Sequence, residues 1–247
     1  RKGLRTVLIE DHGEIGTPVH CGECISDEAV ANLRLNLPPE VISKRVKGIR
    51  VIFPDGTSKQ LTETGYVLEK HLFEQWIAQS AVKEGAKLSL KNRLSSMERI
   101  EKDGKFLGWK CDGKGDIFPL TARIVIDASG VSAVCSKFVK LGNNKPLNEK
   151  GKVVAGMQYE LADVPTDGYL DFYIWPKYAE KGYVWMIPKC DGRANVGLVT
   201  EDRPRAKKAL DEFIADTHFN DLTRQLPQWK QKGSPTFGGT LPISGPF

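Results

Sequence analysis

The sequence has 247 residues and a formal net charge of +5, and 40% of its residues are hydrophobic and 27% charged. That length suits one large domain or two small ones, and the composition is ordinary for a globular protein. No apolar run approaches the ~18 residues of a membrane span, and no basic stripe interleaved with aromatic residues indicates nucleic-acid binding. Five dispersed cysteines argue against a secreted disulfide framework and favour a reducing, cytoplasmic compartment.

The first predicted element is an apolar strand over residues 6–9 that ends in Glu10. A strand that ends in an acid is typical of the second strand of a dinucleotide-binding unit, where the carboxylate accepts hydrogen bonds from ribose hydroxyls. The glycine-rich phosphate loop of such a unit lies about 20 residues before the acid, where this sequence has no room for it. We therefore expect an internal segment of a longer protein, which by itself binds a dinucleotide weakly.

Two helices and several short strands are predicted up to residue 120. Residues 27–35 suit a short helix and residues 70–83 a longer one. In the longer helix five apolar residues repeat at helical spacing: Leu72, Phe73, Trp76, Ile77 and Ala81. Strands are predicted over 47–53, 57–61 and 87–90. A meander is predicted over 97–102, 106–111 and 117–120, with turns at Asp103-Gly104 and Asp112-Gly113.

An unalternating β-branched run follows at residues 124–126, Ile-Val-Ile, and predicts a strand buried on both faces of a parallel sheet. It leads into Asp127-Ala128-Ser129-Gly130, a strand-end turn whose glycine permits a ligand to approach the backbone. The polar segment 140–151 then predicts a domain boundary.

The second half predicts longer antiparallel strands over 153–160, 169–175, 182–187 and 194–199. A helix is predicted from Pro204, with a buried stripe made of Ala206, Leu210, Phe213 and Ile214. Within the third strand Tyr183, Trp185 and Ile187 alternate and so share one face, and Pro188 ends the strand. Such an aromatic face builds either an ordinary core or a wall for a long apolar ligand.

The glycine- and cysteine-rich loop over residues 16–24 has three interpretations. Cys21, Cys24, His20 and His12 supply the ligand types of a zinc site, although the loop has one Cys-x-x-Cys pair rather than two. A redox pair lacks the βαβ context that such motifs require. The third interpretation, a loop that lies over a flavin ring, is what a resemblance to a family of flavoproteins implies. The basic residues near 44–50 and 203–208 also leave two interpretations open, namely solvated faces or a surface for anionic lipid headgroups.

The segment from Tyr183 to Val199 resembles the aromatic strand-turn-strand motif of the geranylgeranyl reductases, especially the archaeal digeranylgeranylglycerophospholipid reductases. That motif reads Tyr-x-Trp-x-Phe-Pro, a spacer, then Gly-x-Gly. Here Ile187 replaces the Phe and Val199 replaces the last Gly. The order of elements also resembles flavoproteins of the para-hydroxybenzoate hydroxylase type. The segment 238–246 is similar to the stretch that precedes the last flavin-contacting motif of the family.

The resemblance implies an α/β fold, α+β overall, that is a fragment of a glutathione-reductase-like FAD domain joined to an antiparallel-sheet substrate domain. It assigns residues 1–46 and 68–142 to the incomplete FAD domain and residues 47–67 and 143–247 to the substrate domain. It also implies that Lys70 stands where relatives carry an arginine for the cofactor's phosphates or ribose; a solvated lysine at the helix start is the alternative.

The resemblance further implies site residues. Cys21 is the candidate proton donor over the flavin, and no metal is expected. The candidate FAD-binding residues are Glu10, Gly22, Glu23, Lys70, Asp127, Ser129 and Gly130. The candidate isoprenoid-binding residues are Tyr183, Trp185, Ile187, Pro188 and Gly197.

These assignments imply an FAD-dependent reductase that saturates carbon–carbon double bonds of geranylgeranyl chains. The implied partners are an isoprenoid lipid or geranylgeranyl diphosphate, an electron donor such as NAD(P)H or ferredoxin, and the surface of a membrane. An aromatic-ring monooxygenase of the same fold is the alternative enzyme, and a lipid-binding module or an inactive fragment is the alternative outside catalysis. Hydrolase motifs such as Gly-x-Ser-x-Gly are absent from the sequence.

Overall fold

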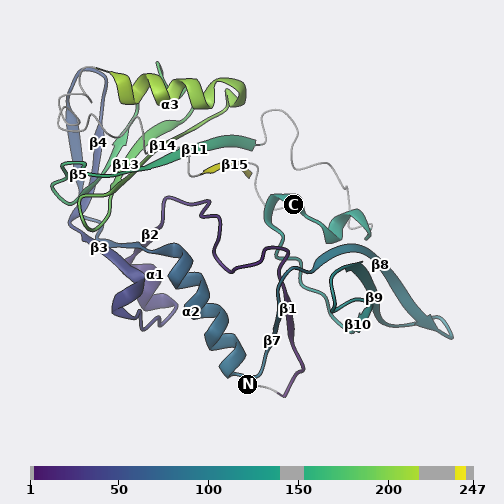
Figure 1. The fold of residues 1–247 in the computed structure, drawn as a ribbon. Coiled ribbons are helices and arrows are strands. Elements are labelled where there is room, and N and C mark those ends of the chain that lie inside the picture. Colours follow the sequence, from purple (N-terminus) through teal and green to yellow (C-terminus); the bar gives the residue numbers. More distant parts are fainter. Residues whose placement is uncertain (1–2, 140–152, 217–236, 243–247) are drawn as a thin grey trace. The chain divides into compact units, whose positions relative to one another are not determined.

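A computed structural model describes residues 3–139, 153–216 and 237–242 (Figure 1). The chain divides into two compact units, residues 1–17 with 74–149 and residues 18–73 with 150–247. The helix α2 (Lys70–Lys83) begins in the second unit and ends in the first, with the bounds that the sequence predicts. The fold is mixed α/β, as predicted. None of the helices in these described ranges is long and apolar enough to span a membrane.

The first unit holds a parallel strand pair and an antiparallel meander. β1 (Val7–Ile9) pairs in parallel with β7 (Lys87–Ser89). The meander consists of β8 (Arg93–Lys102), β9 (Lys105–Lys114) and β10 (Leu120–Ala122), in the order β10-β9-β8. Two short 3-10 turns follow, η2 (Gly130–Ser132) and η3 (Cys135–Lys137).

One of the two predicted hairpin turns is wrong. Asp103-Gly104 connects β8 to β9, and both residues have positive φ, 52° and 73°. Asp112-Gly113 instead lies inside β9, where Gly113 pairs with Leu94. A Cβ on Gly113 would stand 2.1 Å from the backbone oxygen of Arg93. The glycine therefore allows the close approach of β8, and the chain reverses only after β9 has ended.

The predicted buried strand at residues 124–126 is also wrong, because these residues form no strand. Ile124 is 78% exposed and Ile126 is 85% exposed. A strand needs a neighbouring strand to pair with its backbone groups and to cover its side chains. Among the described residues none pairs with this run, so its apolar pattern is not sufficient to form a strand.

The second unit is built on a seven-stranded sheet with the order β15-β11-β14-β13-β12-β4-β5. Its strands are β4 (Gly48–Ile52), β5 (Ser58–Leu61), β11 (Val153–Leu161), β12 (Tyr169–Tyr173), β13 (Tyr183–Pro188), β14 (Ala194–Thr200) and β15 (Phe237–Pro242). All neighbours are antiparallel except β12 and β4, which are parallel. The early hairpin β4–β5 thereby joins strands that come more than 100 residues later.

A smaller antiparallel sheet belongs to the same unit. It has the order β2-β6-β3, formed by β2 (Cys24–Ser26), β3 (Ile42–Val46) and β6 (Gly65–Leu68). The helix α1 (Asp27–Asn32) follows β2 directly and is capped by Ser26, whose hydroxyl accepts a hydrogen bond from the backbone N–H of Ala29 at 3.1 Å. The 3-10 turn η1 (Pro39–Val41) leads into β3.

The helix α3 (Ala206–Ala215) covers one face of the large sheet, as Figure 1 shows. It follows the 3-10 turn η4 (Arg203–Arg205), and the predicted stripe of this helix is buried. The stripe packs against Val184 and Met186 of β13 in one core cluster. Trp185 and Ile187 belong to a second cluster on the opposite face, together with Val46 and Val67 of the small sheet. The predicted alternation along β13 is confirmed, and both of its faces are packed.

The apolar residues of α2 are less buried than their spacing predicts. Ala78 is its one buried residue, and Ile77 is 44% exposed. The predicted boundary at 140–151 and most of the family-like segment 238–246 lie outside the described residues, although β15 includes residues 238–242.

Candidate functional site

A row of side chains crosses the large sheet on the face opposite α3. Gln158 of β11 stands opposite Gly197 of β14, which stands opposite Trp185 of β13. The indole Nε1–H of Trp185 donates to Oε1 of Gln158 at 3.0 Å and so reaches across the intervening strand. A Cβ on Gly197 would lie 2.5 Å from the indole ring. The glycine is therefore what allows the indole to cross.

Aromatic side chains continue this row toward solvent. Trp185 is 8% exposed, whereas Tyr183 is 38% exposed. The Tyr183 ring lies 6.0 Å from the Trp185 ring and packs edge-on against Phe172, with centroids 5.5 Å apart. Burial raises the pKa of the Tyr183 hydroxyl above its usual value. The face is thus buried core at Trp185 and an open aromatic surface at Tyr183; its role as a wall for an apolar ligand stays a prediction.

The cysteine loop, residues 21–24, is attached to this face. The carbonyl of Cys21 accepts a hydrogen bond from Nε2 of Gln158 at 3.2 Å, so Gln158 connects the indole to the loop. A Cβ on Gly22 would lie 3.0 Å from Cδ1 of Ile187. The backbone N–H of Glu23 donates to Sγ of Cys21 at 3.2 Å, and this thiol is partly buried. The loop therefore packs closely on β13 and presents Cys21 beside the aromatic row.

The carboxylate of Glu23 is buried and fully engaged by protein groups. Its Oε1 accepts from the backbone N–H of Lys70 at 2.9 Å. Its Oε2 accepts from Nζ of Lys189 at 2.8 Å and from Nδ2 of Asn195 at 2.6 Å. Glu23 also has a positive φ of 71°, which is uncommon outside glycine. Its predicted role in cofactor binding stays a prediction, and so does that of Lys70.

Lys189 connects Glu23 to a larger, partly buried cluster of charges. The ammonium of Lys189 also donates to Glu69 at 3.0 Å. Glu69 accepts in addition from Ser43 and Arg193, each at 2.7 Å. Burial by itself raises the pKa of Glu69, but these hydrogen bonds outweigh burial and lower it to about 2. Burial likewise lowers the pKa of Lys189, and its hydrogen bonds to the carboxylates outweigh burial and raise it.

Sequence reasoning did not select several residues of this site: Gln158, Lys189, Arg193, Asn195 and Glu69 as an ion-pair partner. For two of them, Gln158 and Asn195, the sequence does contain an indication. Gln158 and Asn195 are polar residues inside otherwise apolar strands, and such residues are buried only when they have hydrogen-bond partners. The identity of those partners depends on strand register, which the sequence alone does not reveal.

The remaining predicted cofactor residues lie in the first unit. Glu10 follows β1, and its Oε1 accepts from the backbone N–H of His12 at 2.9 Å. Burial by itself raises the pKa of Glu10, while hydrogen bonds from His12 lower it to a value below the usual one. Asp127 accepts from the backbone N–H groups of Ser129 and Cys135, which closes a compact turn before Gly130.

The four candidate ligands of the zinc interpretation are divided between the two units, His12 in the first and the other three in the second. His12 groups with Glu10 and Asp11 in the first unit, where one ligand atom of each lies within 4.8 Å of the others. Cys21 and Cys24 lie in the second unit as free thiols, and Sγ of Cys24 donates to the carbonyl of Gly22 at 3.5 Å.

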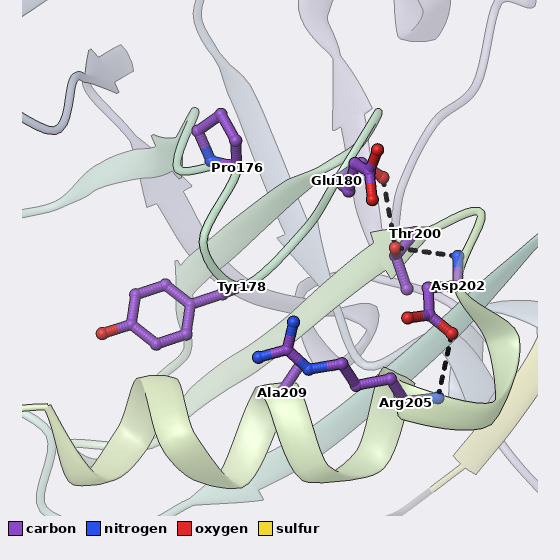
Figure 2. A pocket seen from close by; sticks show the side chains of 7 residues that line it. All are labelled: Pro176, Tyr178, Glu180, Thr200, Asp202, Arg205 and Ala209. Carbon is purple, nitrogen blue, oxygen red and sulfur yellow. Dashed lines mark hydrogen bonds between the residues drawn. The ribbon is translucent and has the colours of Figure 1, made fainter.

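A small cavity lies on the α3 side of the sheet (Figure 2). Its volume is about 40 Å³. That is space for one or a few water molecules and not for a lipid chain. The residues that line it are Pro176, Tyr178, Glu180, Thr200, Asp202, Arg205 and Ala209. The side chains of Thr200 and Asp202 make hydrogen bonds with backbone groups there. These polar residues therefore stabilise the local backbone, and no ligand is needed to explain them.

Several residues of the two basic clusters are paired with acids. Arg50 donates to both Asp171 and Asp167, and Arg45 pairs with Asp27. On α3, Lys207 pairs with Asp211 at 2.8 Å. These pairs favour the interpretation of salt-bridged, solvated faces.

Comparison with known proteins gives consistent matches. Residues 153–227 match the geranylgeranyl reductase catalytic domain. The digeranylgeranylglycerophospholipid reductase of Methanothrix thermoacetophila is 33% identical and that of Methanocella arvoryzae 32%, over 100% and 99% of this chain. These alignments cover 62% and 61% of those relatives, so the chain spans about three fifths of their length.

Solved structures give the same result. A geranylgeranyl bacteriochlorophyll reductase-like protein from Thermoplasma acidophilum has a TM-score of 0.77 and 30% identity, over 98% of this chain and 61% of its own. The halogenase PltM has a TM-score of 0.68 at 12% identity, over 97% of this chain and 55% of its own, and shows the fold alone. A variant of that halogenase was solved in complex with FAD, at a TM-score of 0.66 and 10% identity.

Proposed function

Because this chain is a relative of the geranylgeranyl reductases, we propose that the protein is an FAD-dependent reductase that saturates carbon–carbon double bonds of geranylgeranyl chains in lipids. One observation carries the proposal beyond the resemblance. The aromatic face of β13 and the cysteine loop are joined through Gln158, which bonds to both Trp185 and Cys21. The face that we propose for the isoprenoid chain and the thiol that we propose as proton donor are thus connected within one unit, which supports the proposal.

Two residues of the first unit suit the proposed cofactor. Glu10 stands at the end of a strand of a parallel pair, and its side chain is about one third exposed, 33%. Such a carboxylate suits ribose hydroxyls. Gly130 has a φ of 61°, and apart from its two chain neighbours none of the described residues has an atom within 4 Å of the place where a Cβ would stand, which suits close approach of a ligand to this backbone. When bound, reduced FAD supplies the hydride that an isolated alkene needs.

The proposed role of Cys21 is to hold the proton that completes the addition. The thiol donates it to the alkene carbon that does not take the hydride, and solvent later returns a proton to the sulfur. The backbone N–H of Glu23 points at this sulfur from 3.2 Å, so it orients the thiol and accommodates the thiolate that remains.

The proposed role of the aromatic face is to hold the apolar chain. Tyr183 and Phe172 form its more exposed part, and the buried Trp185 ring packs against Tyr183. Burial of apolar surface against these rings supplies affinity without any polar group on the substrate chain. This surface suits an isoprenoid better than a small phenol, which needs polar contacts to fix its orientation.

The experiment combines the purified protein with FAD, a chemical reductant and a digeranylgeranyl lipid, and measures the product by mass spectrometry. We expect a gain of two hydrogen atoms for each bond reduced. Cys21→Ser is expected to keep flavin binding and to slow reduction by about 10²- to 10⁴-fold, the usual range for a general acid. Cys111→Ser, a substitution of a cysteine inside β9 of the first unit, is the control. Absence of lipid reduction in the parent contradicts the function, and full activity of Cys21→Ser removes the thiol from the mechanism.

A further inference from the structure

We propose that Lys189, through its buried ion pair with Glu23, is a positioning residue that holds Cys21 in place. The inference rests on the proposed function for its catalytic meaning, but its structural part is testable without any substrate. Lys189 is among the largest fully buried side chains in the described parts of the molecule, at 2% exposure, and it directly follows Pro188 at the end of the aromatic strand. Neither the fold nor the comparisons assign it a role.

The first argument is the backbone of the cysteine loop. Glu23 has a φ of 71°, a conformation that costs a non-glycine residue free energy and persists only when its surroundings hold it. This conformation turns the N–H of Glu23 toward Sγ of Cys21, while its carbonyl accepts from the backbone N–H of Leu68 at 2.9 Å. A relaxed Glu23 backbone would move the one hydrogen bond that the structure records at the thiol.

The second argument is the charge balance around that backbone. The buried carboxylate of Glu23 and the partly buried carboxylate of Glu69 approach the same ammonium, at 2.8 and 3.0 Å, and a carboxylate oxygen of Glu160 lies 3.6 Å from it. Without Lys189, Glu69 would keep its ion pair with Arg193, whereas the buried carboxylate of Glu23 would have no cation beside it and would draw in water. Lys189 therefore keeps Glu23 directed inward, toward β14, where Asn195 donates the second hydrogen bond to the same oxygen.

The third argument is the way the loop is attached at its other end. The carbonyl of Cys21 is held by Gln158, and Gly22 packs on Ile187. Residues 21 and 23 are thus each fixed to the large sheet by a polar side chain. The contact between Glu23 and Lys189 is charged and, at 2.8 Å, shorter than the 3.2 Å contact between Gln158 and Cys21. Loss of the charged contact is therefore expected to free the thiol while the Gln158 contact remains.

The test is the rate of alkylation of Cys21 by iodoacetamide, followed by mass spectrometry of its peptide. In Lys189→Met we expect this rate to change by about tenfold or more, equivalent to about 1.4 kcal/mol of lost conformational preference. Lys207→Met is the matched control, because its ammonium also lies 2.8 Å from a carboxylate but on the exposed face of α3. The control is expected to alkylate like the parent.

A second variant covers a failure of Lys189→Met to fold. Asn195→Ala removes one donor to Glu23 without removing a charge, and it is expected to change the alkylation rate in the same direction by a smaller factor. In lipid reduction both variants are expected to lower kcat with KM nearly unchanged, since the aromatic face is retained. Parent-like alkylation in a folded Lys189→Met, or in Asn195→Ala where Lys189→Met does not fold, would overturn the inference. A parent without lipid reduction whose variants still show altered alkylation would contradict the function and leave the positioning role standing.

Discussion

Two apolar runs of this chain, both predicted to be strands, have different structures. Residues 183–188 form β13, whose side chains pack on both faces of the large sheet. Residues 124–126, Ile-Val-Ile, are also apolar, yet they form no strand, and Ile124 and Ile126 are highly exposed. β13 has β12 and β14 as hydrogen-bonded neighbours, whereas the described structure provides no neighbour for the other run. An apolar run therefore predicts the need for a partner, and the partner decides whether a strand forms.

The largest expected effect on stability tests the packed core beneath α3, which the exposed run at residues 124–126 lacks. Phe213 on α3 is fully buried and makes edge contacts with the rings of Tyr173 and Tyr178, with centroids 5.1 and 5.4 Å apart. Phe213→Ala is expected to lower the free energy of unfolding by about 3–5 kcal/mol. Ile126→Ala is expected to change it by less than about 0.5 kcal/mol, because its side chain is exposed. Denaturant unfolding measures both, and equal losses would contradict the comparison.

The next effect is a pH dependence that arises from the charged cluster. The pKa of Glu69 is lowered in the folded protein from 4.5 to about 2. A lowered pKa stabilises the fold at pH values above the unfolded-state pKa, and this contribution is lost as the pH falls from about 5 toward 2. Because solvent screens the charges of this partly exposed cluster, the expected contribution is about 2 kcal/mol, less than the shift alone would give. We expect the difference in stability between the parent and Glu69→Gln to be largest near neutral pH and to vanish near pH 2. A difference that does not change with pH would show that the cluster does not titrate as described.

A smaller effect tests the place where the indole crosses β14. In Gly197→Ala the new methyl group would lie about 2.5 Å from the Trp185 ring and from the backbone oxygen of Met157. We expect a loss of about 1–3 kcal/mol from overpacking, measured as a lower midpoint of urea unfolding. Gly156→Ala is the matched control in the same sheet, since its nearest neighbouring atom would be 3.9 Å away. Equal tolerance of both substitutions would mean that the indole does not lie over Gly197.

The smallest effect concerns the hydrogen bond that joins the aromatic face to the cysteine loop. Trp185→Phe keeps most of the apolar burial and removes the Nε1–H that donates to Gln158. The expected cost is about 1 kcal/mol, the usual net value of one hydrogen bond. Affinity for a geranylgeranyl lipid is expected to fall only slightly, because Tyr183 and Phe172 present the exposed surface. A loss as large as that of Phe213→Ala would mean that Trp185 acts chiefly as core.

The sequence by itself determined the elements whose patterns are local. Helical spacing of apolar residues placed α2 at residues 70–83 and identified the buried stripe of α3, and the alternation from Tyr183 to Ile187 assigned the two faces of β13. The aromatic motif also pointed to the family that the comparisons support. These inferences succeed because side-chain periodicity follows from backbone geometry, which needs no knowledge of distant residues.

Only the tertiary structure decided which residues meet across long sequence separations. Glu23 pairs with Lys189 and Asn195, more than 160 positions later, and Gln158 bonds to Cys21. The same holds for Gly113, which the sequence suggested as a turn and the register of β8 on β9 placed inside a strand. Strand register and strand order determine these contacts, and they depend on how all strands of a sheet pack together. A polar residue in an apolar strand therefore signals that a partner exists, and the fold determines which residue that partner is.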